Sequence, residues 1–192
     1  MHPEMNSKMW RKEKCFKSLT FFLFILFSFW ISLQFLAPLA LPEDSVTDLS
    51  GLVAFSDNDD MINQMSFPMN FVYSAGDRLC HQKFDRSFVI NGNQMPFCSR
   101  CTAIWLGLVL GLGFITFFKI QLNEKFLFAI LLGIFPIGID GIGQLFGFWE
   151  STNVIRFITG LFAGAFCGLA LGIIIDEIKE MKKKKLGGNN SS

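Results

Sequence analysis

The sequence predicts an all-α integral membrane protein with four transmembrane helices. Hydrophobic residues make up 51% of the 192 positions and charged residues only 17%, whereas a soluble domain carries about 25% charged residues. The mean hydropathy is +0.42, and charges are absent from long stretches rather than thinly spread. A helix needs about 20 apolar residues to cross a bilayer. Four runs near that length in so small a chain favour membrane spans over buried helices of a soluble protein.

The four predicted spans cover residues 19–41, 102–118, 126–148 and 154–175. The first follows a basic segment, as the hydrophobic region of a signal peptide would. That region runs only about 7–15 residues in signal peptides, however, and ends at a small-residue cleavage site, which is not evident here. We therefore interpret the first run as an uncleaved membrane anchor.

The distribution of Lys and Arg predicts the orientation of the spans. Basic residues cluster before the first span, after the fourth and in the loop between the second and third, whereas the turn between the third and fourth has none. The positive-inside rule then places both termini in the cytoplasm of a multi-pass protein of the cell membrane. The chain is expected to have five parts. A basic cytoplasmic N-terminus (1–18) precedes the membrane anchor (19–41) and an acidic extracytoplasmic loop (42–71). A Cys/His loop with a three-helix membrane domain (72–176) and a basic cytoplasmic tail (177–192) follow.

The outer segment between the first two spans begins with acidic residues. Six carboxylates in residues 42–60 indicate a solvated loop. Met61, Met65 and Met69 follow at four-residue spacing, which on a helix would form one stripe. Thioethers are soft ligands that bind copper, but such a stripe is also typical of an apolar helix face, and Pro68 would interrupt the helix.

A turn is expected further along the outer segment. Asn91-Gly92-Asn93 separates the apolar triplets Phe88-Val89-Ile90 and Met95-Pro96-Phe97, and Asn-Gly pairs favour tight turns. A small hairpin or loop here would fold the chain back, so that Cys98 and Cys101 approach Cys80 and His81.

Cysteine and histidine gather in this outer segment as a candidate metal site. Cys98 and Cys101 have the Cys-x-x-Cys spacing of a zinc half-site, and Cys80 and His81 would complete a tetrahedral set of four donors. An odd number of outer thiols cannot be paired completely within one chain. Zinc, or another transition metal, is therefore the predicted cofactor.

Two other interpretations of these thiols stay open. Cys98 and Cys101 at a helix N-terminus would have lowered thiol pKa values, as in disulfide oxidoreductases. Alternatively, a static disulfide between Cys98 and either Cys101 or Cys80 would staple the loop. Cys15 and Cys167 are most simply small apolar residues.

Polar side chains within the spans form a second cluster at the same predicted depth. Asp140 and Gln144, four residues apart, share one face of the third span. An intramembrane carboxylate costs at least about 2.5 kcal/mol and marks a functional candidate. Asn153 and Arg156 begin the fourth span at that level, so an Asp140–Arg156 ion pair joining the two helices would be the structural explanation. Glycines in the second and fourth spans indicate close helix packing, including a ladder at every fourth position from Gly160 to Gly172.

These residues resemble the signature of the domain of unknown function 2085 family, which consists of small predicted prokaryotic membrane proteins. The resemblance runs from about residue 72 to residue 176. Its first block is Leu79-Cys80-His81-Gln82, Arg86-Ser87-Phe88, Cys98-Ser99-Arg100-Cys101-Thr102 and Gly107, and its second is Asp140-Gly141, Gln144, Arg156 and Thr159-Gly160. Ala103-Ile104-Trp105 stands where the resemblance leads us to expect Gly-Ile-Tyr. The resemblance indicates which residues matter and implies no activity.

The function predicted from these clusters is that of a membrane protein with an outer Cys/His zinc site above a polar pocket. As an enzyme it would carry out zinc-assisted hydrolysis or transfer on a lipid-linked or anionic substrate. Asp140 and Arg156 would then be catalytic, and the substrate-binding residues would be Arg86, Arg100, Gln144 and Asn153. The alternatives are a thiol-disulfide oxidoreductase and a non-catalytic metal-binding or transport protein. With a net charge of +1 and no basic groove, the sequence predicts no nucleic-acid partner.

Overall fold

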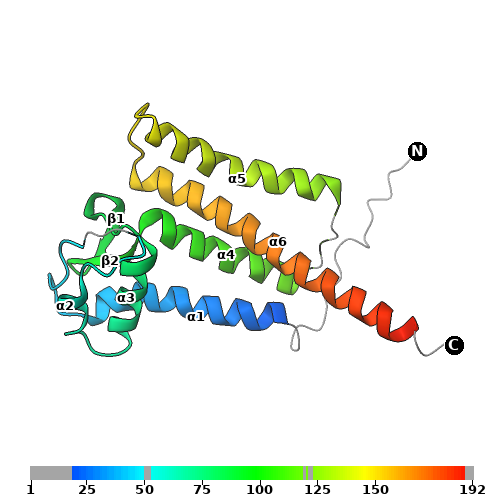
Figure 1. The fold of residues 1–192 in the computed structure, drawn as a ribbon, viewed down its shortest axis with the longest axis horizontal. Helices are drawn as coiled ribbons and strands as arrows, with labels where there is room; N and C mark the ends of the chain where they lie inside the picture. The colour runs from blue at the N-terminus through cyan, green and yellow to red at the C-terminus, as the bar shows by residue number, and fades with distance from the viewer. Residues whose placement is uncertain (1–18, 50–52, 119, 121–122, 189–192) are drawn as a thin grey trace.

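A computed structural model describes residues 19–49, 53–118, 120 and 123–188, and its four long helices confirm the predicted fold class. They are α1 (Leu19–Ala40), α4 (Ser99–Phe117), α5 (Glu124–Leu145) and α6 (Asn153–Gly188). Each contains a segment long and apolar enough to cross a membrane. The helices lie side by side in the order α1, α4, α6, α5 (Figure 1). The last helix continues well beyond the predicted end of the fourth span, which the sequence placed at residue 175.

The alternating direction of the helices gathers distant parts of the chain at one end of this layer. The C-terminal ends of α1 and α5 and the N-terminal ends of α4 and α6 lie at the same end (Figure 1). The segment between α1 and α4 folds over that end as a cap. It contains α2 (Asp59–Ile62), α3 (Met69–Leu79), the 3-10 helix η3 (Phe84–Arg86), β1 (Ser87–Ile90) and β2 (Asn93–Cys98).

The expected hairpin is present in the cap. Strands β1 and β2 are antiparallel, with Ile90 opposite Asn93. The two residues between them, Asn91 and Gly92, both have positive φ, at 55° and 70°. Two positive φ angles define the type I′ turn, which follows the twist of the strands and favours Asn-Gly. The turn therefore sends the chain from β1 back along itself to Cys98 and the start of α4.

The acidic segment is not wholly a solvated loop, and this expectation was wrong in part. Its carboxylates are exposed, but Val46 and Leu49 are buried. They belong to the same hydrophobic cluster as Ile62, Val72 and Tyr73. Apolar burial of this kind contributes about 1.5–3 kcal/mol per large side chain, so it fixes the segment against the rest of the cap.

Two buried amide side chains bind the backbone of this segment. The Asn93 Oδ1 accepts from the Val46 amide at 2.9 Å, and its Nδ2 donates to the carbonyls of Pro38 and Pro42 at 3.0 and 2.9 Å. The Gln94 Oε1 accepts from the Leu49 amide at 2.8 Å. A buried backbone group without a partner costs roughly 1–3 kcal/mol. The two side-chain amides therefore supply hydrogen bonds that a neighbouring strand would supply if the segment were part of a sheet.

The methionine stripe belongs to the same core. Met61, Met65 and Met69 pack against the buried cluster of the cap, and they lie on two separate helices, α2 and α3, and the turn between them. This arrangement favours the interpretation as an apolar face, since the thioethers fill irregular space beside larger side chains.

The expected glycine contacts are present between α4 and α6. A Cβ atom built on Gly107 would lie 2.2 Å from the carbonyl oxygen of Leu161, and one on Gly164 would lie 2.1 Å from that of Ile104. Such distances leave no room for a side chain, so the two backbones are in direct contact, as small-residue ladders in membranes allow. Gly113 instead faces the ring of Phe24 in α1.

Candidate functional site

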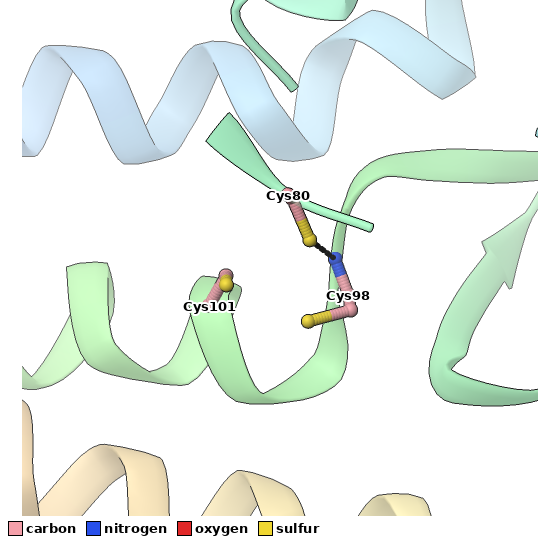
Figure 2. Close-up of side chains that lie close together, drawn as sticks. All are labelled: Cys80, Cys98 and Cys101. Atoms are coloured by element: carbon pink, nitrogen blue, oxygen red, sulfur yellow. Dashed lines mark hydrogen bonds between the residues drawn. The ribbon is translucent and has the colours of Figure 1, made fainter. Parts of the chain in front are cut away.

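Three thiols meet where the cap joins the helices. Cys80 follows α3, Cys98 ends β2 and Cys101 lies in the first turn of α4. Their sulfur atoms all lie within 4.8 Å of one another (Figure 2), and all three cysteines are free thiols. Of the other two cysteines, Cys167 is exposed on α6 and Cys15 lies outside the described residues.

The fold brings Cys80 to Cys98 through a close contact between α3 and β2. A Cβ on Gly76 would lie 1.9 Å from the carbonyl oxygen of Pro96, so only glycine permits this approach. The Gln82 side chain then donates to the same carbonyl at 2.8 Å, from a backbone with φ of 43°. The Cys98 amide in turn donates to the Cys80 sulfur at 3.3 Å, as Figure 2 shows.

The electrostatics of this cluster favour one thiolate, at Cys98. Hydrogen bonds from the Cys101 and Cys80 thiols hold the pKa of Cys98 well below its usual range, and the backbone amides of Arg100 and Cys101 act in the same direction. Amides at a helix N-terminus stabilise an anion by this mechanism. The pKa of Cys80 is raised, because a hydrogen bond with Cys101 lowers it by less than a hydrogen bond with Cys98, burial and the Cys98 charge together raise it. Metal binding would therefore have to release the protons of the neighbouring thiols.

His81 is not part of the three-sulfur group. Its side chain is exposed, although it lines the same cavity as the thiols. The positive φ of Gln82 turns the chain directly after His81. Among the described residues, the three cysteines are thus the close donor set.

The thiols open on a cavity that is rich in cations. This thiol cavity has a volume of about 280 Å³, and its lining includes four basic side chains, which are Lys83, Arg86, Arg100 and Arg156. None of the residues that line it is an Asp or a Glu. The arrangement attracts anions, since clustered charges of one sign beside low-dielectric walls focus the field.

Asp140 is buried behind this cavity and binds Arg100. Its carboxylate forms an ion pair with the Arg100 guanidinium, and the Gln144 Nε2 donates to it at 2.9 Å. The expected Asp140–Arg156 ion pair was wrong: the partner is Arg100 on α4. Asp140 does face the bundle and Gln144 does share its helix face, as the sequence indicated.

Among the residues that the structure describes, Arg156 is held by neutral amides rather than by a carboxylate. Its guanidinium donates to the Gln144 Oε1 at 3.2 Å and to the Asn153 Oδ1 at 3.4 Å. Asn153 also accepts from the Ser99 hydroxyl at 3.1 Å and donates to the Asp85 carbonyl at 3.1 Å. These bonds join α4, α5, α6 and the cap, so the Arg156 charge stays available to the thiol cavity that it lines.

Gln82 is part of the family signature, but neither it nor Gln94 was predicted to hold the site in shape. Gln82 and Gln94 are fully buried, and the Gln94 Nε2 donates to the Gln82 carbonyl at 2.5 Å. The Trp149 indole nitrogen, for which the sequence also predicted no role, lies 3.5 Å from an Asp140 oxygen. The available signals were weak: a glutamine directly after Cys80-His81, and the single tryptophan in the turn between two spans.

The structure thus defines a multi-pass α-helical membrane protein with a three-thiol cluster under an extramembrane cap. A family model described as a predicted membrane protein (DUF2085) matches residues 80–173. A protein of Methanothermobacter thermautotrophicus described as uncharacterised is 41% identical over 93 residues, which cover 48% of this chain and 82% of that protein. The chain belongs to the domain of unknown function 2085 family.

A second relative extends the comparison. The uncharacterised protein MJ1492 of Methanocaldococcus jannaschii is 36% identical over 97 residues, which cover 48% of this chain and 61% of that protein. No solved structure matches the chain. The region matched by the family model begins at Cys80 and contains β1, β2, α4, α5 and most of α6.

Proposed function

We propose that Cys80, Cys98 and Cys101 bind one zinc ion at the membrane surface, in a site that opens on the cationic cavity. The observation that carries the proposal is the convergence of three sulfurs within 4.8 Å of one another. Thiolates around a tetrahedral zinc ion at about 2.3 Å stand about 3.8 Å apart, which falls within that limit. The Cys98 amide donates a hydrogen bond to the Cys80 sulfur, and hydrogen bonds of this kind orient the ligands of a metal ion.

The fourth position of the proposed site faces the thiol cavity. His81 lines that cavity and remains the proposed fourth protein ligand. Because the His81 side chain is exposed and lies outside the sulfur group, water or a substrate would compete with it for this fourth position on the metal. A bound zinc ion would supply a Lewis acid there.

The surrounding residues suit an anionic substrate, and we propose that the protein is an enzyme of hydrolysis or group transfer. Arg86 and Arg156 would bind the anion, because Arg forms paired hydrogen bonds to planar and tetrahedral oxyanions. Gln144 and Asn153 position Arg156. Asp140 already binds Arg100 and Gln144, which supports a role in holding Arg100 toward the cavity rather than in proton transfer.

Substitution of single cysteines tests the metal site. Cys98→Ser is expected to reduce bound zinc from about one ion per chain to near zero, because two thiolates and a hydroxyl form a much weaker donor set. Elemental analysis of protein purified in detergent measures this. Cys15→Ser and Cys167→Ser are the matched controls and should keep the metal; equal zinc in all three variants would contradict the proposal.

A thiol-disulfide oxidoreductase is the second candidate, favoured by the lowered pKa of Cys98 at the start of α4. An oxidoreductase, unlike a metal site, requires a disulfide between Cys98 and Cys101 that forms and breaks during the reaction. A quantitative Cys98–Cys101 disulfide in metal-free native protein, reduced reversibly by dithiothreitol, would replace the zinc proposal with this one.

We further propose that the cap is extracytoplasmic and that both termini are cytoplasmic, because basic residues cluster at the ends of the chain. An impermeant maleimide applied to intact cells is expected to label a cysteine introduced at exposed Asp48 in the cap. It should leave Cys15 unlabelled until the membrane is permeabilised. Labelling of Cys15 in intact cells, with the cap cysteine protected, would reverse the orientation.

A further inference from the structure

Two more hollows lie beside the thiol cavity, toward the lipid-facing side of α5 and α6. The first, which we term the rim cavity, has a volume of about 390 Å³ and shares Arg86 and Arg156 with the thiol cavity. The second, the apolar groove, has a volume of about 470 Å³ and shares Trp149 with the rim cavity. The three hollows are therefore neighbours, and we refer to their succession from the thiol cavity through the rim cavity to the apolar groove as the path.

The apolar groove lies within the membrane-spanning length of the two helices. Its lining includes Phe135 and Ile139 from α5 and Ile155 from α6. The side chains of Ile139 and Ile155 are about half exposed, at 45% and 46%. In a bilayer, side chains exposed on the outside of a span contact lipid tails, so a chain of methylene groups can enter this groove sideways.

The inner end of the path has the opposite character. Arg86 and Arg156 stand where the rim and thiol cavities meet, and Arg100 and Lys83 lie beyond them. Glu150 lines the rim as well, which leaves the cations in excess. Three guanidinium groups suit a phosphate, whose oxygens accept bidentate hydrogen bonds from Arg.

We infer that the ligand of this path is a phosphorylated lipid, with its phosphate on the arginines and one chain in the apolar groove. The inference rests on the anion-binding part of the proposed function and is independent of the metal. Arg100 and Arg86 lie beside Asp140 and Asp85, but the guanidinium of Arg156 donates to neutral amides, so a neutral lipid would leave its charge unbalanced. A free phosphate would leave the groove unused. Charge at one end and apolar surface at the other therefore favour an amphiphile.

Lipid binding to the full-length chain tests the inference. Purified protein in neutral detergent is titrated with dioleoyl phosphatidic acid, with dioleoylglycerol, which has the same chains and no phosphate, and with glycerol 3-phosphate, which has no chains. Native mass spectrometry measures the bound fraction. Phosphatidic acid is expected to bind at least about tenfold more tightly than either of the other two, since charged hydrogen bonds and chain burial both contribute.

Paired variants separate the two ends of the path. Arg86→Gln should weaken phosphatidic acid about tenfold, whereas Arg78→Gln, an exposed cap arginine that does not line these hollows, should not. Ile139→Trp should block the groove, and Ile142→Trp, three residues further along α5, should not. Ile155→Trp repeats the groove test from α6 in case Ile139→Trp does not fold.

Equal binding of phosphatidic acid and dioleoylglycerol would overturn the inference. So would equal binding of glycerol 3-phosphate, which would mean that a phosphate is bound without a lipid chain. Zinc measured on the same samples keeps the proposals apart. Selective lipid binding by zinc-free protein would support the inference while the metal proposal failed, and zinc-loaded protein without lipid selectivity would do the reverse.

Discussion

Replacing Arg100 with glutamine is expected to lower the free energy of unfolding by about 3–5 kcal/mol. The change leaves the Asp140 carboxylate, which is only 4% exposed, without its ion-pair partner inside the membrane-spanning region. The amide of Gln144 would remain as a donor, but a neutral donor offsets only part of the cost of a buried charge. Unfolding of the detergent-solubilised protein by a denaturing detergent measures the change.

The reverse substitution should cost less. The side chain of Arg100 is 26% exposed and lines the thiol cavity, so Asp140→Asn leaves a cation that water can reach. We expect a loss of about 2 kcal/mol, near the value for a lost hydrogen bond to a charged group. The double variant should recover much of the stability lost in Arg100→Gln, because it leaves no orphaned carboxylate.

Additive losses in the double variant would contradict this account of the pair. Arg78→Gln provides the control, since Arg78 is an exposed cap residue that donates to the Ser56 hydroxyl at 3.2 Å. Its removal should change stability by less than about 1 kcal/mol.

The second large effect is expected at the contact of α4 with α6. Gly164→Leu would place a side chain where a Cβ already lies 2.1 Å from the Ile104 carbonyl oxygen. Because the obstacle is backbone, the helices must separate, and we expect a loss of about 3 kcal/mol or failure to fold. Gly138→Leu is the matched control, because a Cβ at Gly138 meets nothing within 4 Å. Similar melting temperatures for the two variants would show that α4 and α6 are not packed in this way.

The helices were predictable because the bilayer sets a length that composition alone reveals. Runs such as residues 126–148 carry that signal whatever their packing. The hairpin was predictable for a local reason: Asn91-Gly92 adopts positive φ angles that most residues avoid. The spans and the hairpin together predict that the three cysteines lie at the same end of the molecule.

The partner of Asp140 was not predictable in the same way. Arg100 and Arg156 lie at one depth, and the choice between them depends on how each helix is rotated about its axis. The direct contact of the α4 and α6 backbones at Gly107 and Gly164 fixes that rotation. Helix periodicity describes one helix at a time and does not contain this information.

The buried part of the acidic segment was hidden by its composition. Val46 and Leu49 are three residues apart among carboxylates, too short a pattern to indicate a core. Their burial depends on Asn93 and Gln94, which are more than forty residues away in sequence. Polar side chains that satisfy distant backbone groups leave no periodic trace in the sequence.

The most direct test of the metal centre measures zinc and thiol accessibility in the same wild-type sample. Protein purified without added metal or chelator is analysed for zinc and alkylated before and after treatment with a strong chelator. We expect about one zinc ion per chain, with Cys80, Cys98 and Cys101 protected from alkylation until the metal is removed. Metal-free protein in which Cys98 and Cys101 are already joined in a disulfide would contradict it.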